Sequence, residues 1–238
     1  MSELLIKDKE IVVPGEELAV GMDFLPSYGT YRRGDKIISN MVGLVHIEGK
    51  VVKLIPLSGK YAPKKEDTII GQVIDVAMSG WRIETNCAYS AMVSLKDATS
   101  DFIARGADLT QYFDIGDWVV AKIINVTSQK LVDMTMKGPG LRKLKGGRVT
   151  RINTNKVPRV IGKAGSMVTM IKVSTDTKII VGQNGVVWIQ GEPEMESIAV
   201  DAIKMIENQS HVSGLTDKVK EFLEKATGKK IEMPEYNR

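Results

Sequence analysis

Two glycines that enclose a lysine and an alanine, Gly162-Lys163-Ala164-Gly165, form the segment of this sequence with the clearest chemistry. Apolar residues flank it on both sides, and those after the second glycine recur at helical spacing. Pro158 fits the first turn of a short preceding helix. We therefore predict two helices that meet at a tight turn, because glycine adopts positive φ and lets another backbone come close. An open turn that carries a cation can hold a sugar-phosphate backbone.

A long run of sequence without any acidic residue surrounds this turn. From Met134 to Thr175 there is no Asp or Glu, whereas the rest of the chain is more acidic than basic. The cations in this run are Lys137, Arg142, Lys143, Lys145, Arg148, Arg151, Lys156, Arg159, Lys163 and Lys172. This clustering is typical of a nucleic-acid surface, although a merely solvated basic face would have the same composition.

The turn and the cations closest to it in sequence are the candidate contacts to single-stranded RNA. They are Gly162, Lys163, Ala164, Gly165, Arg159, Lys156, Arg151, Arg148 and Lys145. The alternative is an ordinary helical corner whose glycines serve packing, and a lone pair of glycines at this spacing would not exclude it.

Composition excludes several classes of protein. The chain has 238 residues, of which 43% are hydrophobic and 26% are charged, as in ordinary folded proteins. One cysteine, Cys87, and two histidines, His46 and His211, cannot build a Cys/His zinc site or an internal disulfide framework. We find no catalytic residue set, expect no cofactor or metal, and do not expect an enzyme. Without an export signal or a membrane-length apolar run, we expect a cytoplasmic protein.

Residues 1–64 are predicted to form a small all-β domain. The expected strands are Glu10–Val13, Lys36–Ser39, Met41–Ile47 and Lys50–Leu57. Glycines punctuate the region, and no cluster suited to catalysis lies in it. A small sheet of this kind is most simply a surface for docking on a partner.

Residues 65–138 are predicted to form a five-stranded barrel of the OB type, because a helix-bearing connection follows the third strand. The expected strands are Thr68–Val76, Trp81–Thr85, Tyr89–Leu95, Trp118–Val126 and Leu131–Met136. The motifs GxV at Gly71, Gly80-Trp81, GDWVVAKI from Gly116 and DxT at Asp133 resemble the S1-type RNA-binding domain.

That resemblance implies that bases stack on aromatics of the second and third strands. Trp81 and Tyr89 are the residues that could do this, and Lys122 on the fourth strand is a further candidate contact. The His-x-Ser that usually follows the third strand is absent, because Met92-Val93-Ser94-Leu95 stands there. Trp81 is therefore a candidate either for RNA or for the core.

Residues 146–208, after a Gly- and cation-rich linker from Lys137 to Gly147, follow the order β-α-α-β-β-α. This order, with GKAG between the first two helices and Asn184-Gly185 in a hairpin, resembles a KH domain, whose GXXG loop grips about four nucleotides. A last helix from Thr216 to Thr227, with Thr216 as its cap, begins a C-terminal region of residues 209–238.

The whole arrangement resembles the archaeal RNA-binding cap subunit of the RNA exosome, the ribosomal-RNA-processing protein four family. The most specific pieces are VVPGE from Val12, GTY from Gly29, DTIIGQV from Asp67, Gly80-Trp81 and RVIGKAG from Arg159. The resemblance implies a non-catalytic subunit, present in three copies on a ring of RNase PH-type subunits that degrades RNA phosphorolytically from the 3′ end. It also implies that the KH domain is partly engaged with that ring.

Two alternatives stay open at this point. The chain could be a free or ribosome-associated binder of single-stranded RNA. It could instead be a phosphorolytic nuclease, which the short region ahead of the barrel disfavours because such enzymes carry long catalytic domains there.

Overall fold

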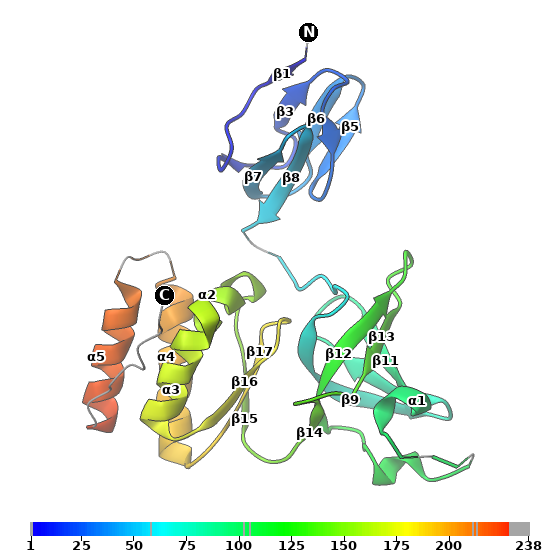
Figure 1. Ribbon diagram of the computed structural model, residues 1–238, viewed down its shortest axis with the longest axis vertical. Coiled ribbons are helices and arrows are strands. Elements are labelled where there is room, and N and C mark those ends of the chain that lie inside the picture. The colour runs from blue at the N-terminus through cyan, green and yellow to red at the C-terminus, as the bar shows by residue number, and fades with distance from the viewer. Residues whose placement is uncertain are drawn as a thin grey trace. The chain divides into compact units, whose positions relative to one another are not determined.

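We describe the protein from a computed structural model that covers residues 2–57, 59–101, 103–104, 106–210, 212 and 214–228. The chain divides into two compact units, Met1–Gly59 and Lys60–Arg238, and we treat each by itself (Figure 1). His211 and the expected C-terminal tail, residues 229–238, lie outside the described residues.

The N-terminal unit consists of two small sheets. One has the strand order β1-β3-β6-β5 and the other β2-β7-β8-β4. The strands are β1 (Glu3–Leu4), β2 (Ile11–Val12), β3 (Glu17–Val20), β4 (Leu25–Pro26), β5 (Thr30–Arg33), β6 (Lys36–Ser39), β7 (Gly43–Glu48) and β8 (Val51–Pro56). The sequence predicted β2, β6, β7 and β8, which confirms an all-β unit. It missed the other four, which are only two to four residues long.

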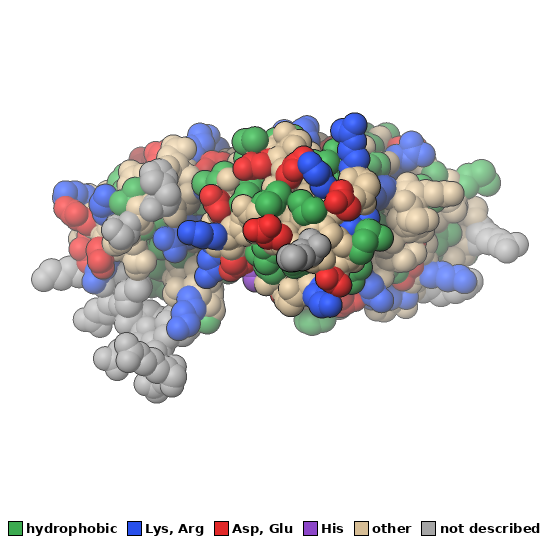
Figure 2. All heavy atoms as spheres, turned by 90° about the horizontal axis from the view of Figure 1, so that it is seen from above, with side chains coloured by type: hydrophobic (Ala, Val, Ile, Leu, Met, Phe, Trp, Pro, Cys, Tyr) green, Lys and Arg blue, Asp and Glu red, His purple; other side chains and the backbone are tan. Residues whose placement is uncertain are grey.

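A compact apolar cluster holds this unit together, formed by alternate residues of its strands. Its fully buried members include Leu18, Ile37, Val45 and Val52. Figure 2 shows a face on which acidic and basic side chains are interspersed and hydrophobic side chains lie among them.

The second unit begins with the predicted five-stranded barrel. Its elements are β9 (Thr68–Ala77), β10 (Gly80–Glu84), β11 (Ser90–Ser94), α1 (Leu95–Ala98), η1 (Leu109–Gln111), β12 (Trp118–Val126) and β13 (Val132–Thr135). The barrel closes because β13 pairs in parallel with β11 and antiparallel with β12. Its interior is packed with apolar side chains, among them Trp81, Ile69, Ile83 and Ile123.

One strand lies where the sequence analysis placed only a linker. Residues Arg142–Leu144 form β14, which pairs antiparallel with Trp118–Val120 of β12. The linker prediction for Lys137 to Gly147 is therefore wrong for these three residues. Leu144 is buried, and it anchors the strand on the barrel. The connection between barrel and KH domain is thus a structured part of the sheet, and β14 is the last strand in its order.

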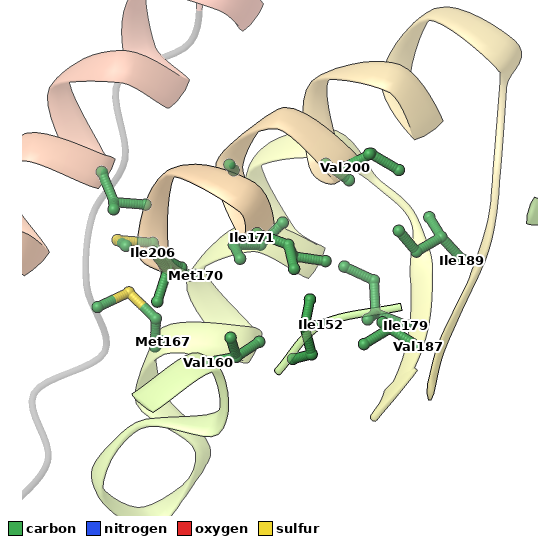
Figure 3. Packing of buried hydrophobic residues seen from close by; sticks show 14 of the residues in the cluster. Ile152, Val160, Met167, Met170, Ile171, Ile179, Val187, Ile189, Val200 and Ile206 are labelled. Atoms are coloured by element: carbon green, nitrogen blue, oxygen red, sulfur yellow. The ribbon is translucent and has the colours of Figure 1, made fainter. Parts of the chain in front are cut away.

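The KH domain has the predicted order of elements. They are β15 (Arg148–Arg151), η2 (Thr154–Lys156), α2 (Val157–Ile161), η3 (Lys163–Gly165), α3 (Ser166–Thr175), β16 (Lys178–Val181), β17 (Val186–Gln190) and α4 (Pro193–Asn208). The sheet order is β15-β17-β16, so β15 and β16 are opposite edges. Figure 3 shows side chains of the helices, such as Ile171 and Val200, facing Val187 and Ile189 of the sheet.

The last helix, α5 (Leu215–Thr227), packs on α3 and α4 through Leu215, Val219 and Leu223. Gly228 follows its last residue in a left-handed conformation, which is typical of a helix C-terminus. The predicted cap is wrong, however, because the helix begins one residue earlier. Gly214 precedes its first residue, and Thr216 lies inside its first turn.

Barrel and KH domain are joined by a buried amide, Asn184, at the tip of the β16–β17 hairpin. Its Nδ2 donates to the carbonyl oxygens of Ile70, at 2.7 Å, and Thr85, at 2.9 Å. The Nδ2 of Asn86 in turn donates to the backbone oxygen of Asn184 at 2.9 Å. The sheet face next to the hairpin adds an apolar contact, in which Trp188 packs in one cluster with Val120. These hydrogen bonds and apolar contacts join the barrel directly to the KH domain.

Candidate nucleic-acid interface

The turn between α2 and α3 has a backbone that requires its first glycine. Gly162 has φ 76° and ψ 175°, and a Cβ built there would lie 2.7 Å from both the backbone nitrogen and the Cβ of Met167. Gly165 also has positive φ, at 80°, but the space beside it is open. Ala164 lies between them in the left-handed region, at φ 51°. The first glycine therefore permits a close approach of the helix, and the second supplies only conformational freedom.

The tip of this turn is presented to solvent with a positive charge. Lys163 and Ala164 are exposed, and Lys163 has no ion pair among the described residues. Helix α3 begins directly after the turn at Ser166, without a side-chain cap. Its first backbone N–H groups therefore lack partners within the helix, and they add the positive end of the helix dipole to the lysine. Together these groups suit a phosphate.

A groove of about 630 Å³ lies beside the turn, between α2, α3, β16 and residues 139–142 of the connection. Its walls combine cations with apolar side chains. The cations are Arg142, Lys172 and Lys178, the apolar residues include Ile161, Val168 and Ile180, and no Asp or Glu is among its lining residues. A floor of this kind accepts bases, while the cations compensate phosphate charge.

None of the predicted cations is among the residues that line this groove. Arg148 and Arg151 are exposed on β15, the sheet edge opposite to β16, and Lys145 lies in the connection that leads to β15. Lys156 is half-buried at the start of α2. The basic block of the sequence is therefore divided between two sides of the KH domain.

Arg159 has a structural contact of its own. Its Nε donates a hydrogen bond of 3.1 Å to the backbone oxygen of Ser210, in the segment that follows α4. This bond ties α2 to the end of the domain, and part of the guanidinium stays exposed. Arg159 remains a predicted RNA contact.

The sequence analysis did not select three groove residues as candidates: Arg142, Lys172 and Lys178. Two of them belong to the acid-free run, so their charge was noted. Lys178 lies beyond that run, because Asp176 ends it. The signal that could have found Lys178 is its position at the start of the second KH strand, which borders the helices of the turn.

Trp81 is not a stacking surface, which corrects one of the two readings of this residue. The side chain is 0% exposed, its Nε1 donates to the backbone oxygen of Phe113 at 2.8 Å, and its ring packs edge-to-face on that of Phe113 at 5.1 Å. A base cannot reach a ring that is enclosed in the barrel core. Its neighbour Arg82 points outward instead.

The other two barrel candidates are accessible to different degrees. Tyr89 is 43% exposed just before β11, so it remains a predicted stacking residue. Lys122 forms an ion pair with Glu66, and the hydrogen bond from its ammonium lowers the pKa of the Glu66 carboxyl. A phosphate would have to compete with Glu66 for Lys122, which makes it a weaker candidate than Lys163.

Within the described ranges, no group of three or more His, Cys, Asp or Glu side chains could hold a metal ion. Nor is any helix in those ranges both long and apolar enough to cross a membrane.

Comparison with known proteins agrees with this architecture. Residues 11–48 match the family model described as the exosome complex exonuclease RRP4 N-terminal region, and residues 147–195 match that of the KH domain. The exosome complex component Rrp4 of Methanothermus fervidus is 46% identical over 92% of this chain and 97% of its own length. The Rrp4 of Thermococcus kodakarensis is 43% identical over 94% of this chain and 88% of its own length.

A solved structure is similar as well. A crystal structure provisionally described as an exosome complex RNA-binding protein superposes with a TM-score of 0.65 at 30% identity. The match covers 71% of this chain and 97% of that one.

Proposed function

The chain belongs to the family of the exosome complex component Rrp4, and on this premise we propose that it is a non-catalytic RNA-binding cap subunit of the exosome. It binds single-stranded RNA and guides it to a phosphorolytic 3′-to-5′ exoribonuclease. The observation that supports this most is the exposed, unpaired Lys163 in a GXXG turn beside a groove lined by cations without acids. A sugar-phosphate backbone is the ligand that this combination suits.

The mechanism we propose is sequence-tolerant binding. Lys163 and the free N–H groups at the start of α3 hold phosphates, and the cations of the groove release counterions as the strand settles. Affinity then depends on salt more than on base identity. The cap subunit contributes binding and orientation, while the bond cleavage takes place in other subunits.

We further propose that the partners are RNase PH-type ring subunits and that three copies of the chain sit on one ring. The N-terminal unit supports a docking role, because large apolar side chains on its surface are exposed. Examples are Ile11, Val13, Met22 and Leu25. The division into domains at residues 1–64, 65–138, 146–208 and 209–238 stays a prediction, as does the cytoplasmic location.

The experiment that tests this proposal is capture of the tagged full-length chain from native lysate, with and without nuclease treatment. We expect RNase PH-type subunits in a complex that survives the nuclease, because protein contacts hold it. Recovery of ribosomal proteins that are lost on nuclease treatment would contradict the cap role and indicate a free RNA-binding protein. Phosphate-dependent degradation of RNA by the purified chain would contradict the non-catalytic role.

A further inference from the structure

A second hollow lies on the other side of the connection between barrel and KH domain. This cleft of about 350 Å³ is bordered by the barrel loop at residues 98–100, by Tyr112 and Phe113, and by residues 136–138 and 141–143. Leu141 and Arg142 line both the groove and the cleft. The two hollows therefore adjoin each other across the connection.

The lining of the cleft continues the chemistry of the groove. Its cations are Lys137, Arg142 and Lys143, its hydroxyls are those of Thr99 and Ser100, and no Asp or Glu is among its lining residues. Tyr112 and Phe113 also line the cleft, but Phe113 is only 9% exposed and its ring packs on Trp81. The cations and hydroxyls are therefore the groups of the cleft that suit a phosphate.

Two of the three cations are available to a ligand. Lys143 forms an ion pair with Asp117, so its charge is compensated within the barrel. Lys137 and Arg142 are exposed, and neither has an ion pair among the residues that the structure describes. The free positive charge of the cleft is thus held by residues 137 and 142, on either side of Gly138-Pro139-Gly140.

Backbone N–H and C=O groups of two edge strands add further polar groups to the groove. β14 is the last strand of the barrel sheet and β16 is the last strand of the KH sheet. Residues of both strands line the groove, Arg142 from β14 and Lys178 to Val181 from β16. An edge strand presents backbone N–H and C=O groups without partners in its sheet, and these can bond the polar edges of unstacked bases.

We propose that the connection at residues 137–143 is itself an RNA-binding element. Single-stranded RNA that is held at the GXXG turn continues through the groove, crosses Arg142 and enters the cleft, where Lys137 compensates a further phosphate. This inference rests on the proposed RNA-binding function and extends it, because it assigns a strand path from the KH domain to the barrel. An extended acidic peptide is the competing occupant, and the test separates the two.

The test compares RNA lengths on the full-length chain. An oligoadenylate of about four nucleotides occupies the turn, whereas one of about twelve is long enough to reach the cleft. Fluorescence anisotropy gives Kd for both lengths with the native chain, the double variant Lys137→Glu/Arg142→Glu and its neutral counterpart Lys137→Gln/Arg142→Gln. The control is Lys204→Glu, which makes one such charge reversal at an exposed position on α4.

We expect the double charge reversal to weaken binding of the longer RNA at least about tenfold. Binding of the short RNA should change much less. For the longer RNA, the plot of log K against log salt should become less steep by about 0.7 for each lost phosphate contact. The glutamine variant should show the same reduction in steepness. Lys204→Glu should reproduce the native values at both lengths.

Three results would overturn the inference. One is an unchanged affinity of the double variant for the longer RNA. Another is an equal loss for both lengths, which would place the two cations at the turn itself. The third is loss of copurifying exosome subunits at unchanged RNA affinity, which would make the cleft a protein contact. Failure of the native chain to bind either RNA would instead contradict the proposed function, so the two failures are distinguishable.

Discussion

The barrel and the KH domain are both folds that bind single-stranded nucleic acid, yet this chain equips them differently. In the KH domain the GXXG turn exposes Lys163 beside a groove whose charged lining residues are all cations. In the barrel the tryptophan at a stacking position, Trp81, is fully buried, and the cations Lys122 and Lys143 are paired with carboxylates.

The difference shows that a fold alone does not determine whether a domain binds nucleic acid, because the side chains on its surface decide this. The barrel buries Trp81 in its own core, and two cations of its sheet, Lys122 and Lys143, are paired with its own acids. In the KH domain, Lys163 and the cations that line the groove form no ion pair among the described residues. We therefore assign most of the RNA affinity to the KH domain and the connection, and a mainly structural role to the barrel face around Trp81.

The largest effect should come from Trp81→Ala, which tests whether Trp81 has a structural role in the barrel core. Removing a buried tryptophan leaves a cavity and orphans the oxygen of Phe113, so we expect the unfolding free energy to fall by about 3–5 kcal/mol. Urea titration of the full chain measures this. The exposed Tyr89→Ala is the matched control and should change stability by no more than about 0.5 kcal/mol. Near-native stability of Trp81→Ala would show that the ring is not part of the core.

The double variant Lys163→Asp/Ala164→Asp tests whether the GXXG turn of the KH domain binds RNA. Asp tolerates the left-handed conformation of residue 164, so the fold should persist while the turn repels phosphate. We expect RNA affinity at low salt to fall by roughly tenfold or more, since a charged hydrogen bond contributes about 1.5–3 kcal/mol. Anisotropy with single-stranded RNA is the measurement. Lys204→Asp is the control. If the turn variant bound RNA as tightly as Lys204→Asp does, the turn would not be part of the binding site.

The junction between the two domains gives a third prediction. Asn184→Ala leaves the carbonyl oxygens of Ile70 and Thr85 without their donor, so we expect a loss of about 1–3 kcal/mol. Thermal unfolding should also broaden or separate into two transitions, because the amide couples the domains. Asn125→Ala, which removes an exposed amide bonded to Asp133, should have little effect. A single sharp transition at the native temperature would show that Asn184 does not couple them.

Tyr89 tests whether the barrel also contributes to RNA binding, with a smaller expected effect. If it stacks on a base, Tyr89→Ala should weaken RNA binding by about 1 kcal/mol, the lower end for such contacts. Tyr89→Phe retains the ring and should bind RNA as the native chain does. A loss that exceeds the effect of the charge reversal at Lys163 would move the main binding site to the barrel.

The smallest effect concerns the compensated cation Lys143. Burial of Asp117 raises the pKa of its carboxyl, but hydrogen bonds from the Lys143 ammonium and from the Asp114 N–H outweigh this, so the pKa lies below its ordinary value. A lowered folded-state pKa stabilises the protein above the unfolded pKa, and this is lost as pH falls below about 4.

Because water reaches both side chains, which are 31% and 23% exposed, the contribution of the pair should be under about 1 kcal/mol. Asp117→Asn should flatten the acid limb of the stability curve by that amount, as denaturant titrations between neutral and acidic pH would show. An acid limb identical to that of the native chain would exclude the pair as a source of stability.

Much of the fold could be predicted from residue patterns. The ranges expected for β6 and β12 are those observed, because each has a clear apolar pattern and clear ends. The short strands β1, β3, β4 and β14 carry little pattern of their own. Each pairs with a strand that lies far away in the sequence and satisfies its backbone groups, which local sequence cannot reveal.

The candidate site was predicted less completely, for two physical reasons. Trp81 was selected by its type, although alternation places it on the same face of β10 as the buried Ile83, with Arg82 and Glu84 on the other face. That pattern alone could have assigned Trp81 to the core. The groove, in contrast, brings Arg142 and Lys178 together through packing of the barrel against the KH sheet, and no local pattern encodes such a contact.

The most direct test of the central claim is photo-crosslinking of a thiouridine-containing single-stranded RNA to the full-length chain, followed by peptide mapping. The account predicts crosslinks in the peptides that contain residues 157–181 and 137–143, which hold the turn, the groove and the cleft. Crosslinks concentrated in residues 80–95 of the barrel, with none at the GXXG turn, would contradict it and make the barrel face the principal site of RNA binding.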